Sequence, residues 1–231
     1  MTVRWEDINT VLTNIPFLIP AATAYTLYLY VRALIFFLMF VASSLYHLCD
    51  SFNVCLFPFS FHHHLDFFFA QFLIILAGAY IIYFPPRYRY IEYWILILGA
   101  VGVVILEVML PSSLIVQAGI VTFVFVATVL YWLICYWLSK YRPKYYRTHY
   151  PLLKGEMPKY NMAYLCTGLA LTAGSIMLFT VQNIWYKEYW LPHSVWHVAA
   201  ALGQHYILLI KDPQRAQTKY MPAARSIYQK Q

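Results

Sequence analysis

Residues 33–50 read ALIFFLMFVASSLYHLCD, and this stretch decides the class of fold. Its first ten residues are all apolar, and Ser43 and His47 follow only toward its end. A mostly apolar run of about 17 to 25 residues crosses the hydrocarbon core of a bilayer as one α-helix. The stretch therefore predicts a membrane-spanning helix that carries an ionisable side chain near one end.

Further apolar runs of similar length occur along the rest of the chain. The composition agrees with them, because 62% of the residues are hydrophobic and only 11% are charged, which is far outside the range of a soluble domain. We predict an all-α membrane protein, a seven-transmembrane helix bundle within residues 1–210, followed by a basic cytosolic tail at 211–231. The predicted spans are 10–31, 33–50, 65–84, 91–109, 113–138, 161–182 and 193–210.

The first run, 10–31, follows Glu6 and Asp7 and has neither a basic leading segment nor a small-residue cleavage site. We therefore expect it to be retained, not removed as a signal peptide. Pro16 and Pro20 lie inside it. Because neighbouring helices or Thr side chains satisfy the carbonyl groups that proline frees, we expect a kinked span here.

The Lys and Arg residues predict the orientation, because cytoplasmic loops of membrane proteins carry an excess of both. With seven spans, all of the 16 Lys and Arg residues except Arg4 and Lys187 fall on one side. That side includes the C-terminal tail, so we predict the N-terminus outside and the C-terminus in the cytosol. This topology accounts for the basic loop 140–159, which is also suited to anionic inner-leaflet lipid. We expect no nucleic-acid partner.

Ionisable side chains inside the predicted spans fall at one depth. Span two ends at the outer face with Ser43 and His47 four residues apart, which places them on the same face of a helix. Span three begins at that face with Asp66, and span seven begins there with His193 and His197. Because polar groups inside a bilayer are costly unless paired or placed in a cavity, the five side chains predict a functional site near the outer leaflet.

Three imidazoles that converge with a carboxylate suit a zinc ion, which is commonly bound by three protein nitrogens with a fourth position left to water in catalytic sites. Asp66 could ligate the ion, orient the water or act as a general base. Ser43 could hold the water or stabilise an oxyanion. The alternative for His193 and His197 alone is a pair of core histidines bonded to carbonyl groups; their predicted proximity to His47 and Asp66 favours the metal.

The remaining histidines and Glu107 allow simpler interpretations. The tract His62, His63 and His64 resembles a metal-binding tract, but it precedes the apolar run, so we favour an interfacial cluster. Glu107 and His205 are either partners behind the metal ligands or polar contacts between helices.

The four cysteines fall in two classes. Cys49 and Cys55 flank the predicted outer loop between spans two and three, where a disulfide can persist, and the sequence leaves both the bonded and the free state open. Cys135 and Cys166 lie inside spans, where we expect them to be small apolar fillers.

The motifs SSLYHLCD at 43–50, Asp66 and HSVWH at 193–197 resemble the three motifs of the seven-span CREST superfamily, which includes alkaline ceramidases, adiponectin-type receptors and the transmembrane protein 8 family. The likeness covers nearly the whole chain. Residues 46–55 with their paired cysteines, HSVWH, and PFLIPAATA at 16–24 are most similar to the transmembrane protein 8 branch, in particular to the myomakers.

This resemblance implies a zinc ion on His47, His193 and His197, with Asp66 and Ser43 close by. It also implies a multi-pass plasma-membrane protein that promotes cell–cell fusion of the myoblast type, as a homodimer or other homo-oligomer. The expected partners are membrane lipids and a second fusion factor. Two departures stand out. Residues 211–231 contain no Cys suited to lipidation, and Ser43 is kept although vertebrate myomakers tend to lose it.

Two functions therefore follow. The first is a fusogen in which zinc holds helices together or grips lipid. The second is a zinc-dependent hydrolase of acyl esters or amides in outer-leaflet lipids, in which Asp66 and Ser43 are catalytic. A receptor for an extracellular ligand is a third class, and no feature of the sequence favours it.

Overall fold

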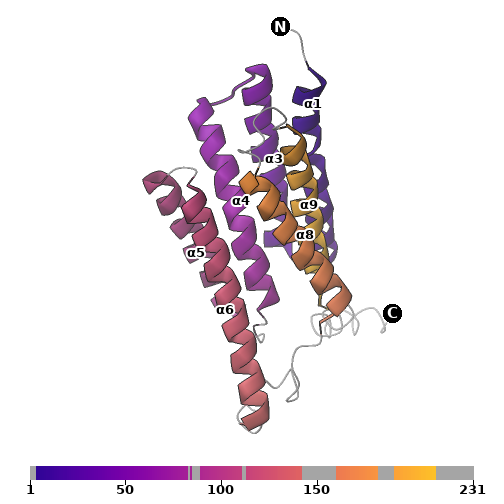
Figure 1. Ribbon diagram of the computed structural model, residues 1–231, viewed down its shortest axis with the longest axis vertical. Helices are drawn as coiled ribbons and strands as arrows, with labels where there is room; N and C mark the ends of the chain where they lie inside the picture. Colours follow the sequence, from indigo (N-terminus) through magenta and orange to yellow (C-terminus); the bar gives the residue numbers. More distant parts are fainter. Residues whose placement is uncertain are drawn as a thin grey trace, which may run out of the picture.

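The computed structural model describes residues 4–82, 84, 89–110, 113–141, 160–181 and 190–211. In this part of the chain the secondary structure is helical apart from turns and an isolated bridge between Tyr160 and Lys211. The helices run nearly side by side (Figure 1). Their bounds are α1 Trp5–Leu12, η1 Ile15–Phe17, α2 Leu18–Thr26, α3 Tyr30–Phe52, α4 Phe59–Ile81, α5 Arg89–Met109, α6 Leu114–Tyr141, α8 Met162–Val181 and α9 Trp190–Leu208.

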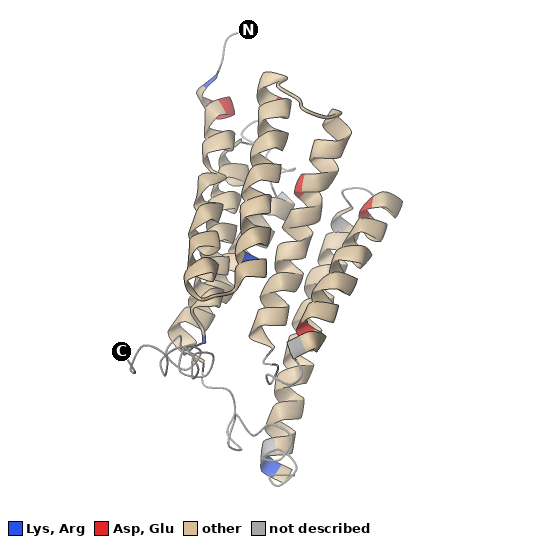
Figure 2. Cartoon of the chain, turned by 180° about the vertical axis from the view of Figure 1, so that it is seen from behind, with Lys and Arg blue, Asp and Glu red and all other residues tan. Residues whose placement is uncertain are grey.

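Helices α3, α4, α5, α6 and α8 are long and apolar enough to cross a membrane, so the chain is a multi-pass membrane protein. Acidic and basic residues are few along the described helices (Figure 2). Each helix overlaps one of the predicted spans two to six. The predicted first and seventh spans correspond to the α1–α2 segment and to α9, and the count of seven spans with its orientation stays a prediction. The basic segments 142–159 and 212–231 lie outside the described residues.

The first predicted span is not one helix. The chain forms α1, then the short 3-10 turn η1, then α2. Pro16 lies in the first turn of η1 and explains the break, since its ring lacks an N–H and clashes with the carbonyl group four residues earlier, that of Leu12. The prediction of a kinked span over 10–31 was wrong at its C-terminal end, because α2 ends at Thr26 and Tyr28 takes a left-handed conformation with φ of 59°.

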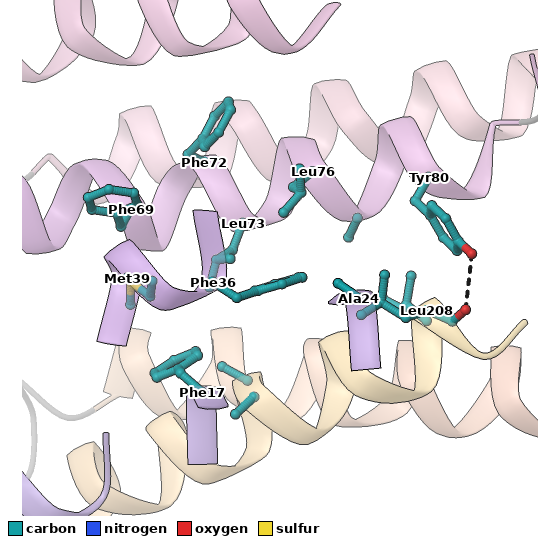
Figure 3. Packing of buried hydrophobic residues seen from close by; sticks show 14 of the residues in the cluster. Phe17, Ala24, Phe36, Met39, Phe69, Phe72, Leu73, Leu76, Tyr80 and Leu208 are labelled. Atoms are coloured by element: carbon teal, nitrogen blue, oxygen red, sulfur yellow. Dashed lines mark hydrogen bonds between the residues drawn. The ribbon is translucent and has the colours of Figure 1, made fainter. Parts of the chain in front are cut away.

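The core lies between α3, α4, α9 and the N-terminal segment, which consists of α1, η1 and α2. Phe17, Phe36, Leu76 and Ala201 come from these four parts, and each is at most 1% exposed. Figure 3 shows side chains of this cluster converging between α4 and the segments opposite it. At one edge of the cluster the Tyr80 hydroxyl donates to the carbonyl oxygen of Leu208 at 3.0 Å, which ties α4 to the end of α9 (Figure 3).

Helices α8 and α9 cross closely at two glycines. A Cβ on Gly168 would lie 3.1 Å from the backbone nitrogen of Ile207 and 3.2 Å from the carbonyl oxygen of Gly203. A Cβ on Gly203 would lie 3.1 Å from the backbone nitrogen of Thr172. Small residues let membrane helices approach until their backbones touch. This crossing holds α9, the helix that carries two of the candidate metal ligands.

A partly buried ion pair joins α3 to α5. The guanidinium of Arg32, 4% exposed, bonds to the carboxylate of Glu92 and also donates to the carbonyl oxygen of Leu76 at 2.8 Å. A charge that leaves water needs such partners. The pair lies near the start of α3, at the opposite end of that helix from His47.

Candidate metal centre

His47 lies in the last two turns of α3, where three local features fix the end of the helix. Asn53 caps it in the left-handed conformation, with φ of 56°. Cys49 and Cys55 form a disulfide across the same turn, so the pairing that the sequence left open is present. Pro58 then begins α4. The position of His47 is therefore set by a cap and a covalent crosslink as well as by packing.

His193 and His197 lie one turn apart on α9, and their ring centroids are 4.5 Å apart. The ring of His47 approaches both, with centroid distances of 4.8 Å to His193 and 5.1 Å to His197. All three side chains are at most 2% exposed. The structure thus brings together the three imidazoles that the sequence placed at one depth.

The ring nitrogens have the spacing of metal ligands. One nitrogen from each ring lies within 4.8 Å of the others. The Nε2 atoms of His47 and His193 are 3.0 Å apart, close to the about 3.3 Å that two nitrogens adopt around a tetrahedral zinc ion. Nε2 of His197 is buried without a hydrogen-bond partner among the described residues. A buried polar atom without a partner is costly, and a cation among these nitrogens would satisfy it.

Ser43 and Asp66 form a separate pair beside this cluster. Ser43 lies one turn before His47 on α3, and its hydroxyl lies next to the carboxylate of Asp66 on α4. Both residues are at most 3% exposed. Oγ of Ser43 and Oδ1 of Asp66 have no hydrogen-bond partner within the described ranges. Asp66 is not in the group of atoms that share the 4.8 Å limit, so the predicted convergence of all five side chains divides into a histidine triad and an adjacent pair.

The other ionisable residues take up contacts between or at the ends of helices. His64 Nδ1 lies 3.1 Å from a carboxylate oxygen of Glu107, whose second oxygen accepts from Gln71. His205 bonds to Thr23 of α2. Of the two interpretations that the sequence left open for Glu107 and His205, the contact between helices is the one observed. His62 is 1% exposed and accepts from the backbone N–H of Phe57 in the loop before α4.

Sequence reasoning did not identify the N-terminal segment as a neighbour of the triad. Oγ1 of Thr13 lies 3.5 Å from Nδ1 of His197, and the amide of Asn9 donates to the hydroxyl of Ser194 at 3.2 Å. The rings of Phe17 and Trp196 lie against His197, at centroid distances of 6.1 Å and 4.4 Å. These polar residues carry no charge and match no motif, so their position became clear only from the packing of α1 and η1 on α9.

Three buried imidazoles in this arrangement can bind one transition-metal ion and leave a fourth position open. Imidazole nitrogen is a preferred ligand of zinc, copper, iron and nickel. The apolar rings around the triad limit access of water, which lowers the local dielectric constant and strengthens each ligand bond.

No curated protein matches the chain. One protein family matches residues 3–198, and its description reads "Protein of unknown function (DUF3522)". The matched region contains the histidine triad together with Ser43 and Asp66. Because the match covers most of the sequence, the chain belongs to the DUF3522 family.

Proposed function

We propose that the chain is a myomaker-like plasma-membrane protein that promotes cell–cell fusion, and that His47, His193 and His197 hold a zinc ion near the outer leaflet. The fusion role rests on the resemblance of the sequence motifs to the transmembrane protein 8 branch of the CREST superfamily. The zinc ion rests on the buried triad, which is the single observation that carries the proposal.

The chemistry of the site favours zinc over the other metals that imidazole binds. A buried three-nitrogen site without thiolates suits a borderline ion with no geometric demand of its own. Zinc has no redox activity, so it suits a site whose role is to hold helices together. The buried rings of Trp196 and Phe17 beside His197 support a site with fixed geometry.

Two independent features support the proposed orientation. The Lys and Arg residues gather on the side that carries the tail. The disulfide between Cys49 and Cys55 closes the turn beside His47, and disulfides persist on the outer side of a cell. Both support a triad near the outer leaflet, with the N-terminus outside and the C-terminus in the cytosol.

In this proposal the zinc ion crosslinks helices. The backbones of α3 and α9 make little direct contact with each other, although both helices pack on the N-terminal segment and on α4. The three rings join α3 directly to α9, although His47 and His193 are 146 residues apart in the sequence. Binding energy at such a site contributes directly to folding.

A small bundle that remodels membranes must act through its lipid-facing surface and through copies of itself. Helices α5 and α6 offer large apolar side chains, such as Val108 at 76% and Phe123 at 74% exposure. Such a surface fits acyl chains, and part of it fits a second copy of the chain in the proposed homodimer.

The test is content mixing between two dye-labelled populations of non-fusing cells that both express the chain, with and without a muscle fusion partner. His197→Ala tests the triad, and His205→Ala, a histidine on the same helix outside the triad, is the matched control at equal surface level. The proposal expects mixing with the unchanged chain and with His205→Ala, and loss with His197→Ala. Absence of mixing at confirmed surface expression contradicts the fusion role.

The pair Ser43 and Asp66 favours a second candidate, a hydrolase of acyl esters or amides in outer-leaflet lipids. A bound zinc ion would lower the pKa of water toward about 7 and polarise the scissile carbonyl group. Asp66 would accept the proton of the attacking water at Oδ1, and the Ser43 hydroxyl would donate a hydrogen bond to the oxyanion. The products would be a fatty acid and the lyso lipid or amine.

The substitution Asp66→Asn separates the two candidates. Under the fusogen proposal cells that express Asp66→Asn still fuse. Under the hydrolase proposal the purified chain releases fatty acid from outer-leaflet lipids, and Asp66→Asn abolishes this release while Asp50→Asn, an exposed carboxylate at the end of α3, leaves it unchanged.

A further inference from the structure

We propose that Thr13 is a positioning residue of the metal centre. Its hydroxyl oxygen accepts a hydrogen bond from Nδ1–H of His197 and thereby directs Nε2 of that ring toward the metal. The inference rests on the proposed metal centre and is independent of the fusion role. The inference also assigns a function to the helix break between α1 and η1, because that break sets the position of Thr13.

The direction of the hydrogen bond follows from the number of protons. A threonine hydroxyl has one proton and two lone pairs. Thr13 lies 3.2 Å from the carbonyl oxygen of Thr10, which can only accept, so the hydroxyl proton points there. The lone pairs of Thr13 Oγ1 remain for Nδ1 of His197 at 3.5 Å, and the ring nitrogen must then be the donor.

This bond determines the tautomer of His197. A neutral imidazole carries one proton, so with Nδ1 protonated the lone pair is on Nε2. Nε2 is the nitrogen that is buried without a partner among the described residues. Metal-bound histidines commonly donate their other ring N–H to a neighbouring oxygen, which fixes both tautomer and ring orientation. Thr13 supplies that oxygen.

The sequence places Thr13 there through the helix break. Thr13 is the residue at which α1 ends, three residues before Pro16, and the turn that follows brings Phe17 against the ring of His197. One turn earlier, Asn9 donates to Ser194 on α9 at 3.2 Å. Two polar bonds and one aromatic contact therefore hold the N-terminal segment on the turn of α9 that carries the triad.

The chain also contains a matched bond away from the triad. The hydroxyl of Thr23 gives its proton to the carbonyl oxygen of Ile19 at 2.9 Å and lies 2.9 Å from Nδ1 of His205. The two threonines thus make the same pair of bonds between the N-terminal segment and α9. Only His197 belongs to the triad, so a loss of the Thr23 bond reports on helix packing alone.

The experiment measures metal affinity of the full chain purified in detergent, by titration of the metal-free protein with Co²⁺ and Zn²⁺. The Co²⁺ absorption bands in the visible range report on the ligand geometry. We expect Thr13→Val, which keeps the shape of the side chain but removes the oxygen, to weaken binding about 10- to 100-fold and to change the Co²⁺ spectrum. Thr13→Ser restores the oxygen and is expected to restore both affinity and spectrum, and Thr23→Val is expected to match the unchanged chain.

Three outcomes overturn the inference. The first is unchanged affinity and spectrum in Thr13→Val. The second is an equal loss in Thr13→Val and Thr23→Val, which would show that packing alone is affected. The third is a failure of the unchanged chain to bind either metal, which overturns the metal centre itself. A chain that binds metal as described but does not fuse cells would contradict only the proposed fusion role.

Discussion

The two ring nitrogens of His197 have different surroundings, although the residue is 0% exposed. Nδ1 faces the hydroxyl of Thr13, whereas Nε2 is buried without a partner among the described residues, in a ring that lies beside the other two imidazoles of the triad. A histidine that only filled the core would be expected to satisfy both nitrogens. At the scale of single residues, this asymmetry is the strongest indication of a metal.

Asp66 is expected to be dispensable for metal binding. Its carboxylate lies beside Ser43, outside the group of ligand atoms within 4.8 Å of one another. Asp66→Asn keeps the size of the side chain and removes only the charge, so we expect the purified variant to retain its zinc. Elemental analysis by mass spectrometry measures this directly. Loss of zinc in Asp66→Asn would make the carboxylate a ligand or an essential support of one.

The triad could be predicted from the sequence, and its polar support could not. His47, His193 and His197 stand out because ionisable groups are rare inside apolar runs. Thr13 does not, since threonine is common in membrane helices and its hydroxyl is usually satisfied by its own helix. Its role depends on where Pro16 breaks the first helix and on how α1 then packs on α9.

Among the helices, the crossing of α8 and α9 determines where His193 and His197 lie. Gly168 and Gly203 face the opposite backbones at distances that exclude an unstrained Cβ. Without this close crossing α9 would move away from α8, and the turn with both histidines would move with it.

We expect Gly168→Ala to destabilise the bundle by about 1–3 kcal/mol, because the added methyl group forces two backbones apart. Gly174→Ala is the matched control, since a Cβ at Gly174 meets nothing within 4 Å. On the same helix it is expected to be neutral or to stabilise by up to about 1 kcal/mol, through the higher helix propensity of alanine. Denaturation curves of the purified variants measure the difference; equal effects of the two substitutions would show that the crossing tolerates a side chain.

The boundaries of the long helices follow from the apolar runs, but the ends that carry polar residues do not. The third run was predicted to begin at 65, whereas α4 begins at Phe59 and includes the three-histidine tract. Apolar character marks only the part of a helix that lies inside a bilayer. The helix continues beyond this part until a capping residue or a proline ends the helix. Here Pro58 precedes α4 and Asn53 caps α3.

For the whole molecule, the charge distribution and the disulfide predict the same orientation in the membrane. We expect an epitope tag at the N-terminus to be labelled by antibody on intact cells, and a tag at the C-terminus to be labelled only after permeabilisation. The disulfide supports this orientation because Cys49 and Cys55 need an oxidising compartment. Labelling of the C-terminal tag on intact cells would reverse the orientation and place the triad near the inner leaflet.

The central claim is that one buried metal ion joins α3 to α9, and the most direct test is the zinc content of the purified chain. The account predicts one zinc ion per chain in the unchanged protein and in His205→Ala, and its loss in His47→Ala, His193→Ala and His197→Ala. Absence of zinc from the unchanged protein after loading, or zinc retained in all three triad variants, would contradict the account.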